Sequence, residues 1–212
     1  MSQFQTTWIV SLVALLIAFM LVGTWIKKQP LGILIDAQCR MSLSRLQVVL
    51  WTWLLISAFF AIAFTFKSME IQIATEIWAL MGISVGSAAG SVIVKGTKAG
   101  QQPSDAVPQN LRNLARQGVL PTKPEPKDAS LSDLFTGEEL TDHTFVDISK
   151  VQMFFFTIAA VSGYAGALWN CELPSPDGSL KFPALSSGLV TLLGISHAGY
   201  LTVKAAPKTP TA

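Results

Sequence analysis

Five stretches of the chain contain no charged side chain and are long enough to cross a lipid bilayer. A membrane-spanning helix needs about 20 mainly apolar residues, because each residue rises about 1.5 Å through a hydrocarbon layer about 30 Å thick. None of the five alternates in polarity every second residue, so the pattern predicts helices and argues against the strands of a membrane β-barrel. The five stretches are residues 8–26, 48–66, 77–94, 151–169 and 182–203.

The composition agrees with a membrane protein. Half of the residues are hydrophobic and only 13% are charged, against about a quarter in an ordinary soluble domain. The formal net charge is only +2, which argues against a broad basic surface for nucleic acid. We therefore expect an integral membrane protein whose first partner is the lipid bilayer, with no nucleic-acid partner.

The basic residues determine the expected orientation. Thirteen of the fifteen Lys and Arg residues fall on one side of the predicted membrane, and only Lys67 and Lys181 lie on the other. The positive-inside rule makes the richer side cytoplasmic, which places the N-terminus outside and the C-terminus inside. A cleaved signal peptide is the competing interpretation of the first stretch. Residues 1–7, however, lack the basic side chains that a signal peptide carries before its apolar core.

These observations predict an all-α integral membrane bundle of five helices. An N-terminal transmembrane helix precedes two transmembrane hairpins, with a cytoplasmic connection before the first hairpin, a cytoplasmic loop between the two and a cytoplasmic tail. The two cysteines, Cys39 and Cys171, fall on opposite sides of the membrane and are not expected to pair. In chain order the six segments are residues 1–28, 29–47, 48–95, 96–149, 150–204 and 205–212.

The two hairpins share a sequence pattern that indicates an internal duplication. A motif LxGIS lies in the second helix of each hairpin, at residues 80–84 and 192–196. Both copies begin on the cytoplasmic side, so the pattern predicts parallel repeats related by a twofold axis along the membrane normal. At a constant offset of 105 residues, four polar positions are identical: Ser44 and Ser149, Gln47 and Gln152, Thr52 and Thr157, Ser57 and Ser162.

The element S-[RK]-x-Q that opens each repeat predicts anchoring at the membrane interface. A basic side chain there reaches lipid phosphates, and a glutamine can bond to the backbone before the apolar run begins. The predicted interfacial anchors are Arg45 and Gln47 in the first copy and Lys150 and Gln152 in the second.

The run GILIDAQCRMSLSRLQVVLWTWLLISAF, with LMGIS downstream and LLGISHAGYLTVKAAP near the C-terminus, resembles a group of uncharacterised bacterial membrane proteins that share SxxQ and LxGIS helices. The resemblance covers residues 29–96 and 149–207. It implies a multi-pass protein of the bacterial inner membrane and implies no particular activity. Phe156 stands in the second copy where Trp51 stands in the first, so the resemblance implies no shared role for an indole ring.

Small residues form stripes on two of the predicted helices. Within 77–94, Gly82, Gly86 and Gly90 share one face, and the opposite face carries Ser84, Ser87 and Ser91. Small residues allow close approach of helices in lipid, and the last stretch carries a comparable set in Gly194, Ser196 and Ala198. We expect these two helices to pack against each other. The alternative is that one stripe contacts a second copy of the chain, and we expect a homo-oligomer.

His197 is the only titratable side chain well inside a predicted span. Ionisable groups in the membrane often mark ion or proton pathways. A neutral histidine bonded to a neighbouring helix is the simpler interpretation, and a gate or proton relay is the alternative. Paired carboxylates, HExxH and phosphate-binding glycine loops are not found in the sequence. We therefore expect no enzyme activity, no cofactor and no metal, and we interpret His143, between Asp142 and Asp147, as part of a solvated turn.

The loop 96–149 is the only sizeable segment outside the predicted membrane. We expect a short amphipathic helix at 111–120 and a proline-rich extended spacer at 121–130. Residues 130–140 predict a second short helix, capped by Ser130 or Ser132, that binds the membrane interface or a cytoplasmic protein partner through Leu131, Leu134 and Phe135. Residues 31–36 have a strand-like composition and are expected to pair with residues 145–148.

Three functions fit these observations. The first is a non-catalytic membrane scaffold or anchor subunit that self-associates and holds a cytoplasmic partner. The second is a channel or pore-forming subunit, in which oligomerisation places Ser, Thr and His197 side chains around a common axis. The third is a small-molecule transporter, because parallel repeats occur in transporters, although no broken helix or buried charge marks a substrate site in the sequence.

Overall fold

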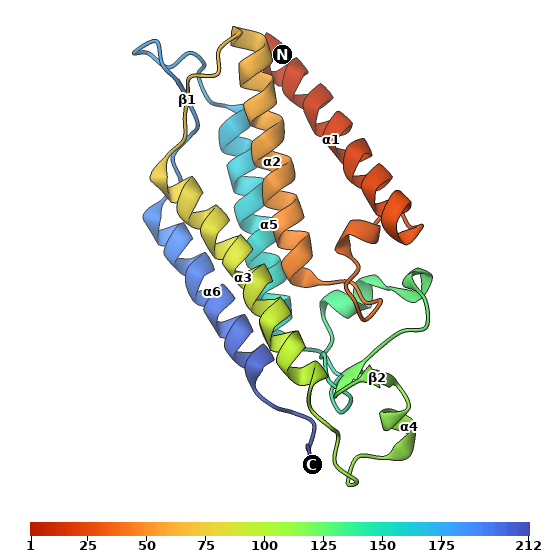
Figure 1. Cartoon of the computed structure of the whole chain (residues 1–212). Coiled ribbons are helices and arrows are strands. Elements are labelled where there is room, and N and C mark those ends of the chain that lie inside the picture. The colour runs from red at the N-terminus through yellow and green to blue at the C-terminus, as the bar shows by residue number, and fades with distance from the viewer.

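The computed structural model describes residues 1–212, and the chain is mostly helical. Figure 1 shows the long helices side by side, with a folded segment and the C-terminus at one end of them. Short strands and 3-10 turns connect the helices. The six helices are α1 (Gln3–Lys27), α2 (Leu43–Phe66), α3 (Thr75–Ala99), α4 (Gln109–Arg112), α5 (Ile148–Trp169) and α6 (Ser187–Ala205).

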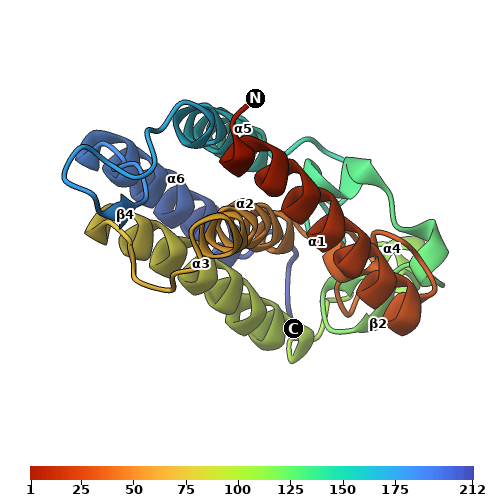
Figure 2. The ribbon, with the colours of Figure 1, turned by 90° about the horizontal axis from the view of Figure 1, so that it is seen from above.

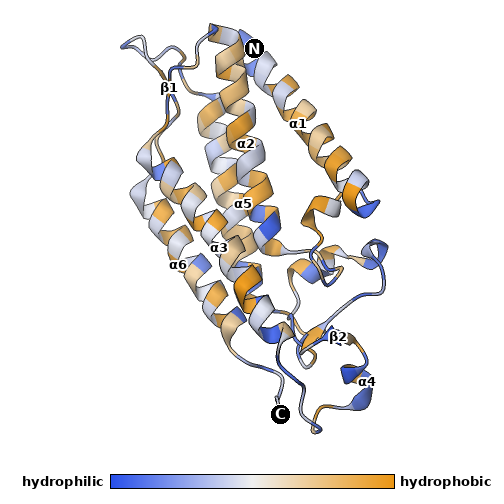
Figure 3. Cartoon of the chain, viewed as in Figure 1, coloured by the Kyte–Doolittle hydropathy of each residue, from blue (hydrophilic) through white to orange (hydrophobic).

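Four helices, α1, α2, α3 and α5, are long and apolar enough to cross a membrane. The hydropathy colouring of Figure 3 shows apolar residues along these helices and hydrophilic residues gathered at one end. The fifth predicted span is less apolar, because α6 includes His197 and Lys204. Helix α6, with 19 residues, is also shorter than the predicted stretch 182–203. Residues 182–186 are not helical, since the chain here pairs with the other connection and the Phe182 N–H donates to the Gln72 carbonyl at 2.9 Å. The hydroxyl of Ser186 caps the helix by accepting a hydrogen bond from the Leu189 N–H at 3.1 Å.

The helices α2, α3, α5 and α6 form the bundle, and α2 contacts α1, α3 and α5. Figure 2 shows α2 at the centre when the molecule is seen from above. Helix α6 packs against both α3 and α5. The expected contact between the second helices of the two hairpins, α3 and α6, is therefore present.

At the far end of the bundle the connections of the two hairpins pair with each other. Strand β1 (Ile71–Gln72) runs parallel to β4 (Leu180–Lys181). Helix α2 ends there at Phe66, and the next residue, Lys67, has a left-handed backbone with φ of 52°. This pairing ties the α2–α3 connection to the α5–α6 connection.

Most of the buried apolar residues form one core in the half of the bundle nearer that far end. Trp51 of α2 lies 6.3 Å from Tyr164 of α5 between ring centroids. Trp8 of α1 donates its indole N–H to the Ser57 hydroxyl at 3.0 Å, which satisfies both polar groups in an apolar setting. The core includes Phe4, Trp8, Trp51, Leu54, Ala58, Ala61, Ile62, Ile77, Leu80, Ala160, Tyr164, Leu168, Phe182 and Leu193.

Helix α1 lies beside the bundle and leaves most of its surface exposed. It is fixed at its start by Phe4 and Trp8 and near its end by Gly23. At Gly23 a Cβ atom would lie 2.7 Å from the carbonyl oxygen of Pro30, so only glycine permits this close approach of the chain that follows the helix. The exposed face of α1 is apolar and contains Val10, Val13, Leu16, Ile17, Met20, Leu21, Trp25 and Ile26.

We call residues 100–147 together with residues 206–212 the cap. Within it, Val119, Leu120, Leu134 and Leu140 are buried. The C-terminal tail joins the cap because the Ser104 N–H donates to the carbonyl of Pro210 at 2.9 Å. The cap is therefore a folded body at one end of the bundle and not the extended spacer that the proline-rich sequence predicts.

Several predictions inside the cap are corrected by the structure. The amphipathic helix expected at 111–120 is limited to α4, and a small antiparallel pair follows, β2 (Ala115–Gln117) with β3 (Leu120–Pro121). Gly118 makes the turn between them with φ of 60°, a backbone conformation that ends any helix there. The expected strand pairing is also wrong, since Ile35 pairs with Met41 and Val146 pairs with Thr136.

The capped turn expected near residue 130 is present in a shorter form. Residues Leu131–Leu134 make a 3-10 turn, and the Ser130 hydroxyl accepts from the Ser132 N–H. A second 3-10 turn, Pro126–Asp128, interrupts the proline-rich stretch. The third, Gly32–Leu34, follows α1.

Candidate functional site

A buried cluster of ion pairs joins the cap to the helices, and its centre is Glu138. Three ammonium groups from three different helices converge on this carboxylate. The Nζ atom of Lys150 in α5 lies 2.9 Å from Oε1, and Lys204 in α6 and Lys95 in α3 lie 2.6 Å and 3.4 Å from Oε2. The side chains of Lys150 and Lys204 are only 2% and 3% exposed. We call Glu138 and these three lysines the Glu138 cluster.

Each lysine of the cluster has a further partner. Lys95 pairs with Asp36, Lys150 donates to the Thr136 carbonyl at 2.7 Å, and Lys204 donates to the Tyr200 hydroxyl at 2.9 Å. An ammonium group has three N–H donors, so several partners are needed when it leaves water. The cluster thus spreads its charge over groups from the helices and the cap.

The pKa of Glu138 is held well below its usual range. Burial by itself raises the pKa, but the nearby charges of Lys95, Lys204 and Lys150 outweigh this effect and favour the ionised carboxylate. Glu138 is therefore a permanent anion at neutral pH, and the three lysines keep it so.

Two further carboxylates of the cap are held in the same way. Glu139 lies 2.5 Å from the Nζ atom of Lys98 and accepts from the backbone N–H of Thr209 at 2.5 Å. Asp133 lies 2.8 Å from the Nζ atom of Lys123 and 3.4 Å from Nε of Arg40. Burial by itself raises the pKa of each carboxyl, but the hydrogen bonds and charges of these partners outweigh burial, so each pKa lies below its usual range.

The bundle interior next to the cluster is polar. The side-chain amide N–H of Gln47 in α2 donates to the Thr157 hydroxyl of α5 at 2.6 Å, and the Ser44 hydroxyl donates to the Tyr200 hydroxyl at 3.3 Å. Ser84, Ser87 and Ser91 of α3 are buried as well. Of the eight buried side-chain atoms that have no hydrogen-bond partner, four lie in this region: Gln47 Oε1, Ser84 Oγ, Ser87 Oγ and His197 Nδ1. We call this region the polar core.

His197 belongs to this polar core and is only 4% exposed. The simpler interpretation of the sequence places a hydrogen bond between His197 and a neighbouring helix, but Nδ1 has no partner in the structure. Ser196, beside it, is also buried.

The glycine and serine stripes of α3 have different surroundings. The serine stripe, including Ser84, faces the bundle interior, and Gly90 approaches Leu201 of α6, where an added Cβ would lie 3.1 Å from a methyl group. A Cβ added at Gly82 or Gly86 would meet no atom within 4 Å, so these two glycines do not pack inside the chain. On α6, Gly194 lies near Ile83, and Ala198 is exposed.

The four predicted interfacial anchors separate into two groups. Arg45 and Gln152 are exposed, as expected for anchors. Gln47 is fully buried and bonded to Thr157, and Lys150 points into the Glu138 cluster. The anchor interpretation is therefore wrong for Gln47 and Lys150, because a partner inside the protein replaces the contact with lipid headgroups.

The segment 130–140 is largely committed to contacts within the chain. Asp133, Leu134, Glu139 and Leu140 are buried, whereas Leu131 is 60% exposed. The apolar anchors that the sequence assigns to a partner are thus reduced to Leu131 and the half-buried Phe135.

Other candidate sites are simpler. Cys39 and Cys171 are both free, and no group of three His, Cys, Asp or Glu side chains is arranged to hold a metal ion. His143 contacts the Leu140 carbonyl through Nδ1 at 2.9 Å.

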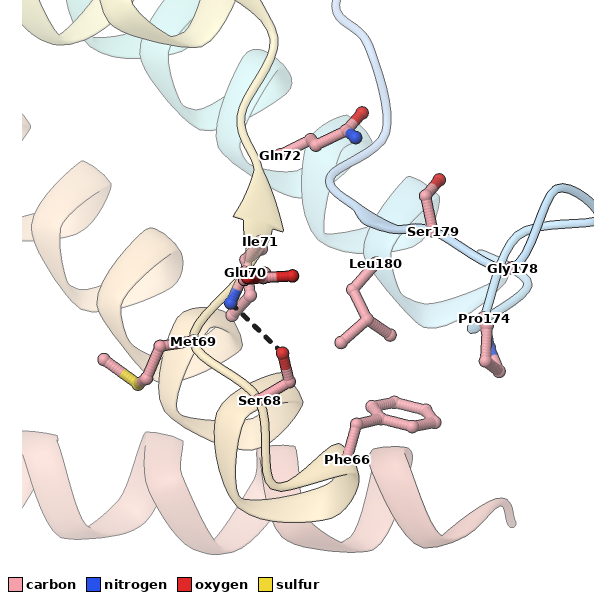
Figure 4. A pocket seen from close by; sticks show the side chains of 10 residues that line it. All are labelled: Phe66, Ser68, Met69, Glu70, Ile71, Gln72, Pro174, Gly178, Ser179 and Leu180. Atoms are coloured by element: carbon pink, nitrogen blue, oxygen red, sulfur yellow. Dashed lines mark hydrogen bonds between the residues drawn. The ribbon is translucent and has the colours of Figure 1, made fainter.

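At the far end a cavity of about 620 Å³ lies between residues 66–72 and 174–180. Glu70 is its only charged lining residue, and Figure 4 shows the Glu70 N–H bonded to the Ser68 hydroxyl.

Comparisons with known proteins find no relative of this chain. No protein-family model matches the chain, and neither a curated protein nor a solved structure shows significant similarity to it.

Sequence reasoning missed the Glu138 cluster, although the sequence contains a signal for it. Glu138 and Glu139 are the only two adjacent acidic residues in the chain. Lys95, Lys150 and Lys204 each stand next to the end of a charge-free stretch, which places all three at one level of a bundle.

Proposed function

We propose that the protein is a non-catalytic scaffold or anchor subunit of the bacterial inner membrane, with no cofactor. In this proposal α1, α2, α3, α5 and α6 all cross the bilayer, the two hairpins are parallel repeats, the N-terminus is outside and the cap lies in the cytoplasm.

The proposed topology is supported by charge and length. Thirteen of the fifteen basic residues belong to the end that carries the cap, and Lys67 and Lys181 belong to the opposite end. Helix α6 has 19 residues, which corresponds to about 28 Å at about 1.5 Å per residue and matches the thickness of the hydrocarbon layer. Helices α3 and α5 pack against α6, and the polar side chains of His197 and Lys204 on α6 are buried.

The observation that carries the scaffold proposal is the attachment of the cap by the Glu138 cluster. A buried ion pair stabilises little in net terms, but removal of one partner is costly because the remaining charges lose their compensation. Lysines from three helices therefore fix one position of the cap relative to the membrane. A surface held in one position is suited to present a docking site to a soluble protein.

Apolar residues on the outside of the cap are the proposed contact surface. Leu131, Phe145 and Val146 are 60%, 67% and 63% exposed. The segments that carry them are joined, since the Gly137 N–H donates to the Phe145 carbonyl at 3.1 Å. The open glycines Gly82 and Gly86 are the proposed contact between copies of the chain in a homo-oligomer.

A channel subunit is the second candidate, and the polar core is the observation that favours it. Buried hydroxyl groups and an unpartnered His197 are typical of pathways for ions or protons. Within one chain, however, the Glu138 cluster blocks the cap end of this core with four charged side chains. Conduction would thus need a displacement of the cap.

A flux measurement separates the two candidates. Purified protein in liposomes loaded with a pH-sensitive or potassium-sensitive dye should give no flux above protein-free liposomes if the protein is a scaffold, with gramicidin as the positive control. Flux that falls in His197→Ala, with Thr191→Ala on the exposed face of α6 as the matched control, would favour the channel and reject the scaffold as the sole function.

Docking is tested separately with photo-crosslinking residues in living cells. Probes at positions 131 and 145 should each crosslink one discrete cytoplasmic protein, and a probe at Leu114, which is also exposed on the cap, should not. Crosslinks to lipid alone from positions 131 and 145 would contradict the proposed contact surface. Point substitutions are preferable to deletion of 130–140, because that segment contains Asp133, Glu138 and Glu139.

A further inference from the structure

A cleft of about 550 Å³ lies between the end of α3, the start of α2 and residues 36–38. Its lining changes in character along its length. Val85, Ala88, Ala89 and Val92 of α3 form an apolar wall, and Asp36, Gln38, Ser42, Arg45, Lys95 and Gln117 gather at the end nearer the cap.

The apolar wall has the length of a lipid chain in one leaflet. From Val85 to Lys95 the helix advances ten residues, which is about 15 Å at about 1.5 Å per residue and half of a hydrocarbon layer about 30 Å thick. Val85 and Val92 are 51% and 67% exposed. Between them, Ala88 and Ala89 have the smallest side chains of the wall, so a hydrocarbon chain can lie against the helix.

The polar end contains a cation without an anionic partner. Arg45 is exposed, forms no ion pair, and donates one hydrogen bond from Nη1 to the Ile35 carbonyl at 3.1 Å. Lys95, in contrast, is committed to Asp36 and Glu138. A guanidinium group presents paired N–H donors that match the oxygens of a phosphate.

The lining also offers a second, neutral contact. The side-chain oxygen of Gln38 is buried and has no hydrogen-bond partner, so it is available to a hydroxyl donor. With two cations, Arg45 and Lys95, against the single carboxylate of Asp36, the charge of the lining favours an anionic ligand.

We propose that this cleft binds one anionic phospholipid of the cytoplasmic leaflet, of the phosphatidylglycerol class. The headgroup phosphate lies on Arg45, a headgroup hydroxyl donates to Gln38, and one acyl chain lies along Val85, Ala89 and Val92. Basic pockets on the cytoplasmic side of membrane helices are suited to such headgroups. This site goes beyond the scaffold function and depends only on the cap end facing the cytoplasm.

Native mass spectrometry of the purified full chain, with added phosphatidylglycerol, phosphatidylethanolamine or phosphatidylcholine, tests the proposal. The wild type should retain one phosphatidylglycerol with about tenfold preference over the other two lipids, because their headgroups carry an ammonium group beside the phosphate, which the positive charge of Arg45 disfavours. Arg45→Gln should abolish the preference, and Ala89→Trp, which fills the apolar wall at an exposed position, should abolish retention of the lipid.

Two matched variants are the controls. Arg116→Gln removes an exposed cation of the cap that does not line the cleft, and Ile93→Trp adds a ring to an exposed position of α3 outside the cleft; both should bind as the wild type does. Equal retention of the three lipids, or an unchanged preference in Arg45→Gln, would overturn the proposal. Glycerol 3-phosphate that displaces the lipid and binds equally to Ala89→Trp would instead assign the site to a soluble phosphate.

Discussion

The two ends of the bundle are stabilised by different interactions. At the far end, aromatic and aliphatic side chains such as Trp51, Tyr164 and Ile62 are packed in one apolar core. At the cap end, charged side chains that would be costly to bury alone compensate one another around Glu138. Apolar packing responds mainly to shape and volume, whereas ion pairs respond to charge and pH. The apolar end of the molecule therefore supplies packing energy, and the charged end fixes the position of the cap.

The largest effect is expected from removal of the central charge. Glu138→Gln keeps the size of the side chain but leaves Lys95, Lys150 and Lys204 without their shared anion, which should cost about 3–5 kcal/mol. Limited proteolysis of the cap and denaturant unfolding in detergent measure this loss. The matched control is Glu125→Gln, whose pair with Lys127 is more than half exposed and should contribute at most about 1 kcal/mol. Equal effects of the two variants would contradict the special role of the cluster.

A cavity in the apolar core should cost somewhat less and leave the cap attached. Ile62 is fully buried, so Ile62→Ala should destabilise the protein by about 2–4 kcal/mol. Val13→Ala, at a half-exposed position of α1, is the control with little expected change. Unfolding curves give the loss, and proteolysis should show a cap as resistant as in the wild type. A cap that opens in Ile62→Ala would show that the two ends are not separate.

The pH dependence should distinguish the two ends as well. The pKa of Glu138 in the folded protein lies well below its ordinary value, which is about 4.3 in an unfolded chain. Its stabilising contribution is therefore complete above that pH and is lost as the pH falls through the folded-state pKa. Stability of the wild type should therefore decline as the pH falls below about 4.3. The melting temperature of Glu138→Gln should fall less with decreasing pH than that of the wild type. The melting temperature of Ile62→Ala should fall with pH as the wild-type value does.

The smallest effect is expected at the contact of α1 with the bundle. Trp8→Phe removes the hydrogen bond from the indole N–H to the Ser57 hydroxyl but keeps an aromatic ring in the core. The Ser57 hydroxyl still donates to the Leu54 carbonyl, so the loss should be about 0.5–1 kcal/mol. Thermal unfolding measures it, with Trp25→Phe on the exposed face of α1 as the control. A loss above about 2 kcal/mol would indicate that α1 depends on this single bond.

The helices could be predicted from the sequence because the membrane requires long charge-free stretches. The stretch 48–66 corresponds to α2, and 151–169 corresponds to α5. The structure extends both helices toward the cap, where Asp147, for example, caps α5 by accepting from the N–H of Ser149. The last stretch is the exception, because its first residues follow the β1–β4 pairing and the Phe182 N–H donates to the Gln72 carbonyl, so that α6 begins only at Ser187.

The Glu138 cluster could not be predicted in the same way, since it depends on how the loop folds. Lys150 follows the predicted S-[RK]-x-Q pattern as closely as Arg45 does, yet one side chain is buried and the other is exposed. The burial of one side chain and the exposure of the other cannot be predicted from the local sequence. The difference arises because the cap returns to the bundle and places Glu138 beside Lys150, whereas Arg45 forms no ion pair and bonds only to the Ile35 carbonyl.

Hydrogen exchange at the cap amides tests most directly whether the Glu138 cluster holds the cap in one position. The Leu140 N–H donates to the Val119 carbonyl at 3.0 Å, and the Val119 N–H donates to the Lys98 carbonyl at 3.3 Å. In lipid nanodiscs these two amides should exchange as slowly as those of α3 in the wild type, and much faster in Glu138→Gln but not in Glu125→Gln. Rapid exchange of both amides in the wild type would contradict a cap fixed to the membrane helices.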